Sequence, residues 1–409
     1  METCARQLPA GARARDGNTV ETANRPSPRA ACLLLSRSFP LFRQKRFVFL
    51  ESFYGGSHRA FADGLVAHSR HRIDLVTLPA RFWKWRMRGA ALHFLRKIDQ
   101  LDAYDGLIAT DLIGLADFKA LAGNACPPIL VYFHENQLTY PLAPGETMDY
   151  QFGFTDITTA LAADVIRFNS HSHHRAFLDG LPGFLKMMPD YRPQWVVEAI
   201  RGKCGVLYPG CNFPLHADMR AAAAEATEPP LIIWNHRWEF DKNPVSFFDA
   251  LDAMVAQGVD FRLALLGENC QTVPKVFIRA RERYGARLLR YGYVPSRTAY
   301  IDWLKRGAIV VSTAQQENFG IAVVEAVRFG CLPLLPARLA YPEVIPERFH
   351  PHVLYQDQEE LNARLHRLIT RRADYDRLRA DLIEAMGRYA WPAVIDAYDE
   401  TLDALAALS

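Results

Sequence analysis

Short apolar runs alternate along most of the chain with longer stretches in which apolar and polar residues are mixed. The run R-F-V-F-L-E-S-F-Y from residue 46 predicts a buried strand, and a glycine turn leads from it into a helix through Phe61, Leu65 and Val66. Strands and helices that alternate in this way are typical of a doubly wound parallel sheet. Further strands are predicted at residues 73–78, 106–109, 129–133, 165–168 and 206–208.

The alternation stops between residues 214 and 230, where small and polar residues replace the strand pattern. We interpret this break as an interdomain linker, because domain boundaries usually fall in such segments. The pattern restarts with predicted strands at 231–235, 261–266, 288–291, 309–312 and 332–335, and Trp391 begins a predicted amphipathic helix. The predicted parts are an extension at 1–45, a first domain at 46–213, the linker, a second domain at 231–388 and a C-terminal helix at 389–409.

Length and composition support two globular α/β domains. At 409 residues the chain exceeds what one hydrophobic core usually serves. Half of the residues are hydrophobic and 23% are charged, but no apolar stretch approaches the roughly 18 residues that would span a bilayer. The net charge of +3 is too small to indicate nucleic-acid binding by itself, so that case depends on local patches.

The seven cysteines are scattered and form no C-x-x-C pair, which favours reduced thiols in a cytosol over a disulfide framework or a zinc site. The first 45 residues are rich in Arg, Ala and Pro and show little periodicity. Their apolar run A-C-L-L-L-S-R-S-F-P-L-F is short and is broken by Arg37. A disordered extension or an overlong gene start is therefore favoured over a signal peptide.

The segment Q-E-N-F-G-I-A-V-V-E-A holds two glutamates, Glu317 and Glu325, with seven residues between them. A predicted buried strand precedes the segment and Gly330 closes a short helix after it, so Glu317 is expected in a loop and Glu325 on the helix. If both were helical, the rise of about 1.5 Å per residue would separate them by roughly 12 Å, about the length of a nucleoside diphosphate. One carboxylate is then placed to meet a sugar and the other a ribose, although the spacing alone is common by chance.

Two cations follow another apolar strand, in the segment L-I-I-W-N-H-R-W-E-F-D-K-N-P. Arg237 and Lys242 lie close to a predicted helix start, with Asn243 as the N-cap and Pro244 as the first helical residue. Cations near helix N-termini suit a diphosphate, although solvated charges at a strand end explain the same residues. Because open α/β sheets bind ligands at the carboxyl ends of their strands, the cations and the two glutamates together predict a ligand site.

The glutamate pair and the Arg/Lys pair resemble the motifs of retaining glycosyltransferases of the family-four type. The resemblance implies the GT-B architecture, in which two Rossmann-like domains face each other across a cleft and the C-terminal helix crosses back to the first domain. It assigns Arg237 and Lys242 to the donor diphosphate. It likewise assigns Glu317 to the transferred sugar and Glu325 to the ribose. The rest of the donor set implied within the motif is Asn318, Phe319 and Gly320.

No D-x-D motif occurs in a suitable loop, so no metal and no other cofactor is expected. The charge on the departing diphosphate would then be offset by the two cations and by helix amides. GT-B enzymes typically act without a metal ion, which agrees with this expectation. The resemblance also implies retention without a protein nucleophile, in which the acceptor attacks from the face that the diphosphate leaves and a phosphate oxygen takes the proton.

The first half offers candidates at its own strand ends. Gly55 and Gly56 precede a helix, so their amides suit a close approach to a phosphate or sugar, although a bare turn explains them equally. His58 extends this turn and suits orientation of the donor or acceptor, or else capping or packing. The segment Y-F-H-E-N-Q-L-T-Y-P places His134 and Asn136 after an apolar strand. A histidine there is more often structural when taken alone, but His134 resembles the family-four histidine that contacts the transferred sugar. Glu135 or Asn136 is a candidate for binding the acceptor.

The segment L-P-A-R-F-W-K-W-R-M-R interleaves basic and aromatic residues. It offers cations for a phosphate backbone and rings for base stacking, and a solvated helix start with tryptophans facing the core explains the same letters. Lys186 and Arg192, in the later run F-L-K-M-M-P-D-Y-R-P, are expected to help. The acceptor-binding candidates of the first segment are Arg81, Lys84, Arg86 and Arg88.

Several segments sharpen the resemblance: E-S-F-Y-G-G-S-H, L-P-A-R-F-W-K-W-R, Y-F-H-E-N-Q-L-T-Y-P, Y-Q-F-G-F and M-P-D-Y-R-P. Together they resemble the tRNA-queuosine mannosyltransferases over roughly residues 46 to 385. This resemblance implies transfer of mannose from GDP-mannose to queuosine in the anticodon loop of tRNA(Asp), in the cytoplasm and without a membrane. The first 45 residues have no counterpart in it.

Two other interpretations stay open. A glycosyltransferase acting on a lipid, a polysaccharide or a small-molecule acceptor fits the second-half motifs, and a membrane-active version is expected to show an exposed basic amphipathic helix. A non-catalytic module that binds nucleotide sugars or RNA is disfavoured by the full set of two cations and two glutamates. The donor base is expected near Gly267, Glu268 and Asn269 and near the turn at 293–295.

Overall fold

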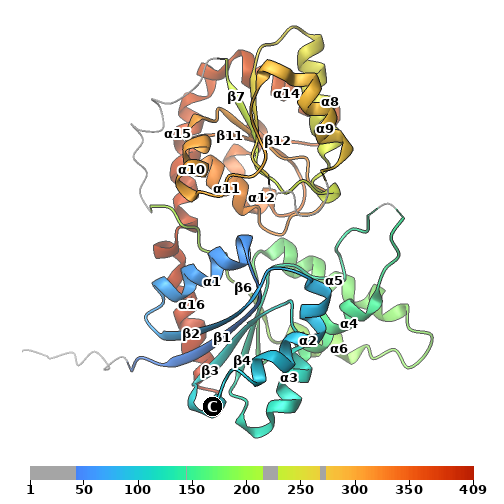
Figure 1. Cartoon of the computed structure of the whole chain (residues 1–409), viewed down its shortest axis with the longest axis vertical. Helices are drawn as coiled ribbons and strands as arrows, with labels where there is room; N and C mark the ends of the chain where they lie inside the picture. The colour runs from blue at the N-terminus through green and yellow to red at the C-terminus, as the bar shows by residue number, and fades with distance from the viewer. Residues whose placement is uncertain (1–42, 144, 215–228, 268–272) are drawn as a thin grey trace, which may run out of the picture. The chain divides into compact units, whose positions relative to one another are not determined.

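The computed structural model describes residues 43–143, 145–214, 229–267 and 273–409. Residues 44–409 form one compact unit that holds two six-stranded sheets. The strand orders are β2-β1-β3-β4-β5-β6 and β12-β11-β10-β7-β8-β9, and all recorded strand pairs are parallel. The predicted α/β fold with two doubly wound parallel sheets is confirmed (Figure 1). The predicted N-terminal extension and most of the predicted linker lie outside the described residues.

The first sheet and its helices consist of β1 (Arg46–Tyr54), α1 (Gly56–His68), β2 (Arg72–Pro79), α2 (Trp83–Leu95), β3 (Gly106–Thr110), α3 (Leu115–Ala122), β4 (Ile129–Phe133), α4 (Tyr150–Ala162), β5 (Val165–Phe168), α5 (His171–Lys186), α6 (Trp195–Arg201) and β6 (Cys204–Val206). The second begins with β7 (Leu231–Trp234), α8 (Pro244–Ala256), β8 (Arg262–Leu265), α9 (Lys275–Tyr284), β9 (Leu288–Tyr291), α10 (Arg297–Arg306) and β10 (Ile309–Val311). It continues with α11 (Ile321–Arg328), β11 (Leu332–Pro336), α12 (Tyr341–Val344), α13 (His350–Val353), β12 (Leu354–Tyr355), α14 (Gln358–Thr370), α15 (Asp376–Ala385) and α16 (Trp391–Ala406).

The strand β1, which pairs with β2 on one side and β3 on the other, shows how the sequence builds a sheet that is covered on both faces. Successive side chains of a strand point to opposite faces. Val48 and Leu50 join the core under α2, α3 and α4, whereas Phe47 and Phe49 join the core under α1 and α16 (Figure 1). A strand buried on both faces reads as a continuous apolar run, as the sequence here does.

The last helix, α16, packs on the first sheet although the preceding elements belong to the second. Trp391, Tyr398 and Leu402 of this helix are buried in the same cluster as Phe47 and Phe61. A Cβ atom on Gly64 of α1 would lie 1.9 Å from Nε1 of Trp391, so glycine is required for α1 to approach this closely. The C-terminal helix therefore packs, together with α1, on one face of the first sheet.

Two strands differ from the sequence prediction. The ladder of β6 is formed by Cys204–Val206, whereas the apolar letters favoured residues 206–208. The apolar run continues past the ladder because Leu207 packs in one cluster with α16 and the Tyr208 ring packs on Phe319 and Tyr389. The Tyr398 hydroxyl of α16 donates to the Tyr208 carbonyl at 2.9 Å. β12 was not predicted, because two residues carry no periodicity.

None of the helices in the described ranges is long and apolar enough to cross a membrane.

Candidate active site

Lys242 is a buried cation held by two carboxylates. It ends a short 3-10 helix, Phe240–Lys242, that connects β7 to α8, and its side chain is only 9% exposed. Its ammonium nitrogen donates to the Gln316 carbonyl at 2.6 Å and lies 3.2 Å from Asp241 Oδ2 and 3.4 Å from Glu317 Oε2. Burial lowers the pKa of Lys242, but Glu317 and Asp241 outweigh burial and leave this pKa above its ordinary value. Lys242 is therefore a fixed positive charge.

Asn243 lies at the N-cap position of α8 and Pro244 is the first helical residue, as predicted. The Asn243 side chain makes no capping hydrogen bond. The reason is its left-handed backbone, with φ 48°, a conformation that asparagine tolerates better than most residues. Asn243 acts here through its backbone conformation.

Glu317 lies in the loop between β10 and α11 and Glu325 lies on α11, as the sequence predicts. Glu317 uses both oxygens, because Oε1 accepts from the Gly320 amide at 3.0 Å while Oε2 faces Lys242. Burial raises the pKa of Glu317, but Lys242 and His236 lower it further, so the net pKa lies below its ordinary value. Gly320 has φ +91°, which favours glycine at this helix start. Glu317 thus stays a carboxylate anion at the N-terminus of α11.

Glu325 is paired with a residue that the sequence did not single out. Its Oε1 accepts from Arg297 Nη2 at 2.5 Å, and the same nitrogen lies 3.4 Å from the Asn212 carbonyl. Arg297 is the first residue of α10, directly after the turn at 293–295 where a base was expected. The position of Arg297 beside that turn is the feature of the sequence that could have identified it as a site residue.

Arg237 is the more accessible of the two predicted diphosphate ligands. Its side chain is 45% exposed, and Nη2 lies 3.2 Å from Glu239 Oε2. Tyr140, from the first half of the chain, lies within electrostatic range of Arg237, Glu135 and Asp241. Burial and these acids raise the pKa of Tyr140, so its hydroxyl stays protonated. A hydroxyl and a cation from different halves thus lie in one region.

The backbone of His134 is fixed by three polar side chains. Its amide donates to Asp111 Oδ1 at 2.9 Å. Its carbonyl accepts from Asn169 Nδ2 at 2.9 Å and from Asn318 Nδ2 at 3.1 Å. Asp111 and Asn169 follow β3 and β5, whereas Asn318 belongs to the glutamate motif of the second half. The Asn318 bond therefore brings His134 next to the Glu317 loop.

The imidazole of His134 is neutral and has an unused nitrogen. Burial and the neighbouring His58 and His173 hold the pKa of His134 well below its ordinary value. The ring lies 4.1 Å from that of His58 and 4.8 Å from that of Phe61, measured between centroids. Within the described part of the chain, Nε2 of His134 is buried and has no hydrogen-bond partner. A neutral nitrogen of this kind can exchange a hydrogen bond with a sugar hydroxyl.

His58, in contrast to the neutral His134, is positively charged. Burial lowers the pKa of His58, but Glu51, Asp111 and Glu135 raise it to about 9, so the imidazole is protonated at neutral pH. Its Nδ1 lies 3.3 Å from Glu51 Oε2, and Glu51 is fully buried in β1. A carboxylate inside an otherwise apolar strand was visible in the sequence and marks this ion pair. His58 is thus a positive charge neutralised within the protein.

Among the described residues, Glu51, His58 and His134 offer a carboxylate oxygen and two ring nitrogens that lie within 4.8 Å of one another, a set that could hold a metal ion. The contact between Glu51 and His58 already uses two of these atoms on each other. Metal binding here would have to displace the proton of His58. The expectation that no metal is required stays a prediction.

Backbone packing and backbone conformation explain why glycine occupies positions 55 and 56. A Cβ on Gly55 would lie 2.4 Å from the Cβ of Ala80, and Gly56 has φ +51° with open space around it. Gly55 is the N-cap residue of α1, and Gly56 is the first residue of that helix. The Oδ1 atom of Asn136 accepts from the Leu138 and Thr139 amides at 3.1 and 3.0 Å, whereas its Nδ2 is buried and has no hydrogen-bond partner among the described residues. Contacts of these residues with donor or acceptor stay predictions.

The basic segment around α2 is mixed in its exposure. Trp83 packs on Phe152 of α4 with centroids 5.0 Å apart, as the core-facing interpretation predicts. Trp85 is exposed, which that interpretation does not predict. Arg86 is half-buried and donates to the Pro79 carbonyl at 3.2 Å. The exposed basic residues are Arg81, Lys84 and Arg88.

The predicted base-binding loop is only partly described. A Cβ on Gly267 would lie 1.7 Å from the His236 carbonyl oxygen, so close backbone packing explains that glycine. Glu268 and Asn269 lie outside the described residues. Tyr293 is exposed in its turn.

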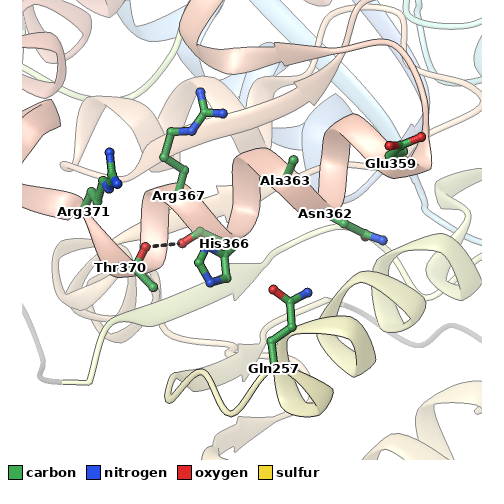
Figure 2. Close-up of a pocket in the computed structure, with 8 residues that line it drawn as sticks. All are labelled: Gln257, Glu359, Asn362, Ala363, His366, Arg367, Thr370 and Arg371. Atoms are coloured by element: carbon green, nitrogen blue, oxygen red, sulfur yellow. Dashed lines mark hydrogen bonds between the residues drawn. The ribbon is translucent and has the colours of Figure 1, made fainter.

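A groove of about 700 Å³ lies between the end of α8 and α14, and Figure 2 draws the residues that line it. No candidate site residue lines this groove, so we give it no part in the chemistry. Its lining residues are Gln257, Glu359, Asn362, Ala363, His366, Arg367, Thr370 and Arg371.

Comparison with known proteins gives two family matches. Residues 46–211 match the tRNA-queuosine alpha-mannosyltransferase N-terminal family, and residues 217–386 match the glycosyl transferases group 1 family. The chain is 39% identical over 307 residues to the tRNA-queuosine alpha-mannosyltransferase of Drosophila melanogaster, covering 73% of this chain and 81% of that protein. It is 23% identical over 194 residues to a GDP-mannose:cellobiosyl-diphosphopolyprenol alpha-mannosyltransferase of Xanthomonas oryzae, covering 46% of this chain and 51% of that protein.

Solved structures of similar fold are glycosyltransferases of the GT-B type. Sucrose-phosphate synthase of Thermosynechococcus elongatus superposes with a TM-score of 0.70 at 16% identity, covering 89% of this chain and all of that chain. The catalytic domain of starch synthase IV of Arabidopsis thaliana superposes with a TM-score of 0.65 at 11% identity, covering 89% and 100%. At these identities the likeness concerns the fold, and it confirms the predicted GT-B architecture.

Proposed function

The chain belongs to the tRNA-queuosine alpha-mannosyltransferase family, and from this premise we propose that it transfers mannose from GDP-mannose to queuosine in the anticodon loop of tRNA(Asp). It is a glycosyltransferase by its two family matches and by its fold. The donor, the particular tRNA, the cytoplasmic setting and the independence of metal are parts of the proposal. The observation that carries it at the site is the Asn318–His134 hydrogen bond, which joins a neutral imidazole to the glutamate motif.

The donor would lie between the two halves of this site. Arg237, as the accessible cation, takes the diphosphate, and Lys242 adds its fixed charge while it holds Glu317 in place. Charge that develops on the departing diphosphate is stabilised by preorganised cations without reorganisation of water. Glu325, oriented by Arg297, faces the ribose hydroxyls.

The sugar would meet one neutral and one anionic group. Nε2 of His134 has the capacity for a hydrogen bond to a mannose hydroxyl, and its depressed pKa keeps it from competing with the cations for the diphosphate. Glu317, as an anion, accepts hydrogen bonds from sugar hydroxyls. With no protein nucleophile required, the proton of the attacking hydroxyl passes to a phosphate oxygen of the leaving group.

The test is incubation of the purified protein with GDP-mannose and queuosine-containing tRNA, followed by mass spectrometry of the nucleosides. A hexose added to queuosine only when GDP-mannose is present would support both donor and acceptor. Omitting divalent ions and adding a chelator should leave the yield unchanged. If queuosine stays unmodified while GDP-mannose is slowly hydrolysed, the acceptor belongs to another class, such as a lipid or a polysaccharide.

A further inference from the structure

Two aromatic residues on the surface of the first half adopt a left-handed backbone conformation. Phe82 has φ 55° and Tyr191 has φ 45°, and their side chains are 69% and 92% exposed. This conformation is unfavourable for residues other than glycine, asparagine and aspartate, and such strain tends to persist where function requires it. Burial of the rings does not offset the strain here. Both residues instead hold a flat apolar ring out into solvent.

Further exposed rings accompany these two. Trp85 on α2 is 75% exposed, and Tyr150 and Trp195, the first residues of α4 and α6, are exposed as well. Large apolar side chains scattered singly on a surface need no explanation, but several in one region mark an interaction site. We call the set the aromatic face: Phe82, Trp85, Tyr150, Tyr191 and Trp195.

The elements that carry the aromatic face are packed against one another. Arg88 of α2 donates to Gln151 Oε1 in the first turn of α4 at 3.1 Å. Phe154 of α4 packs on Phe184 in the last turn of α5, with ring centroids 5.0 Å apart. The chain continues from α5 through Tyr191 into α6, and Figure 1 shows α2, α4 and α6 grouped on one side of the first sheet. Helix α4 therefore packs against α2, which follows Phe82, and against α5, which precedes Tyr191.

The aromatic face carries exposed positive charge that is not neutralised internally. Within the described residues, its exposed cations form no ion pair with a carboxylate, and the segment 79–92 contains no acidic residue. Exposed acids near these residues along the chain include Glu146, Asp149, Asp190 and Glu198, and Asp149 caps α4 by accepting from the Gln151 amide at 3.2 Å. The cations are Arg81, Lys84, Arg88, Lys186 and Arg192.

Packing connects this surface to the candidate active site. Ala80, two residues before Phe82, contacts the Gly55 turn so closely that only glycine fits there. Trp83 packs in one cluster with Phe53, whose ring centroid lies 5.9 Å from that of His58. The start of α2 is thus linked to His58 through the cluster against which Phe53 packs.

We propose that the aromatic face binds unpaired nucleotides of the RNA acceptor, with rings stacked on bases and cations on phosphates. Single-stranded loops are the RNA elements whose bases are free to stack on aromatic side chains, and this stacking tolerates any sequence. The inference rests on the proposed function and names the surface that would hold the acceptor. Arg86, half-buried and bonded to the backbone, is left out of it.

A membrane surface is the competing partner for a basic and aromatic patch, and the structure disfavours it. A helix that lies on a bilayer presents a continuous apolar side. The apolar residues of α2, Met87, Ala90 and Phe94, are buried in the protein core instead. The exposed rings stand separately among cations, as stacking on single bases requires.

The test uses glycine, which tolerates the left-handed conformation, at both strained positions. The double variant F82G/Y191G should keep or raise the melting temperature, because the strain is removed, and should bind an anticodon stem–loop at least tenfold more weakly. The ring-retaining variant F82Y/Y191F should bind as the natural protein does. Leu121→Ala, an exposed apolar residue at the end of α3, is the matched control.

A salt titration of the same binding reaction tests the cations. The double variant K84A/R192A should reduce the slope of log affinity against log salt by about 0.7 for each cation, as counterion release from single strands predicts. Arg377→Ala, an exposed arginine of α15, should leave the slope unchanged. Binding is measured by fluorescence anisotropy with a labelled stem–loop.

The outcomes separate this surface from the proposed function. The inference is overturned if the glycine variants bind RNA as tightly as the natural protein does. It is also overturned if these variants lose binding to phosphatidylserine vesicles but keep their RNA binding. If the natural protein adds no hexose to queuosine but the glycine variants lose stem–loop affinity, the proposed function fails and the surface stands. If transfer proceeds and affinity is unchanged in the variants, the function stands and the surface fails.

Discussion

Both halves of the site bury a cation beside a carboxylate, but they use it differently. In the second half, Lys242 is held by Asp241 and Glu317, and Glu317 in turn holds the start of α11. In the first half, His58 is held by Glu51, and its ring lies against the neutral ring of His134. Lys242 thus fixes the anion Glu317, which we propose contacts the sugar, whereas His58 lies behind the neutral His134 ring.

This difference teaches how a site can handle a diphosphate and a neutral sugar side by side. The positive charge of His58 is cancelled by a fully buried partner, so it adds little field at the ligand. Arg237, half in solvent, keeps its charge available. We therefore expect the second half to determine affinity for the diphosphate and the first half to determine contact with the sugar.

Among the substitutions that test this difference, Lys242→Ala is expected to have the largest effect. It leaves Asp241 and Glu317 buried without their cation, which we expect to cost about 3–5 kcal/mol of unfolding free energy. Transfer should fall about 10³-fold, because the diphosphate loses a cation and Glu317 loses its position. Denaturant unfolding and initial rates measure the two effects. Lys97→Ala, an exposed lysine, should change neither, and full activity of K242A would remove Lys242 from the donor site.

Glu51→Gln tests the first half through pH. Because the folded pKa of His58, about 9, lies above its unfolded value of 6.5, the pair contributes stability below pH 6.5 and loses it as pH rises through 9. The full contribution is about 3 kcal/mol. Burial also raises the pKa of Asp111 to about 7, although His58 lowers it, so the stability that this carboxyl contributes is lost as pH rises from 3.8 to about 7, below the pH at which His58 titrates.

Unfolding free energies are therefore compared between pH 7.5 and 9.5. The natural protein should lose stability over this window, and E51Q should start lower and lose little. Gln keeps the bond that Glu51 Oε1 accepts from the Phe53 amide at 2.8 Å. Glu198→Gln, an exposed glutamate, should follow the natural protein. Parallel curves for E51Q and the natural protein would show that Glu51 does not set the charge of His58.

Arg237→Ala should affect binding and leave the fold unchanged. Removing the accessible cation should weaken GDP binding by about tenfold to 100-fold, or roughly 1.4–2.8 kcal/mol, with an unchanged melting temperature. Calorimetric titration with GDP checks the affinity. Arg201→Ala, which also breaks a single exposed ion pair, is the control. Equal GDP affinity in R237A would assign the diphosphate to another group.

The smallest effect is expected from Asn318→Ala. This change removes the bond to the His134 carbonyl, which keeps its bond from Asn169, so we expect a loss of about 1 kcal/mol in transition-state stabilisation. The rate at saturating donor should fall severalfold, while GDP affinity should not change. Asn362→Ala, which breaks a hydrogen bond within α14, is the control. An unaltered rate would mean that the Asn318 bond does not position His134.

The sequence was sufficient for the fold because both sheets are parallel. Strands covered on both faces form continuous apolar runs, and eleven of the twelve were visible, although β6 was misplaced by two residues. β12 was missed because it has only two residues. The loop and helix positions of Glu317 and Glu325 followed from the strand before them and the glycine after them.

The site was predicted only where its residues lie on one motif. The partners of His134 and Glu325, namely Asp111, Asn169 and Arg297, come from other strand ends and another helix. Their meeting depends on the strand order of the sheet, which a single sequence does not give. The charge states of His58 and His134 were also out of reach, because they follow from burial and from neighbours distant in the chain.

The most direct test of the division between the two halves is calorimetric titration of His134→Ala with GDP and with GDP-mannose. We predict that GDP binds H134A as it binds the natural protein, while the additional affinity for GDP-mannose is lost. In Arg237→Ala both ligands should be weakened together. If H134A weakens the binding of GDP and of GDP-mannose equally, or weakens the binding of neither, the assignment of the sugar to the first half is contradicted.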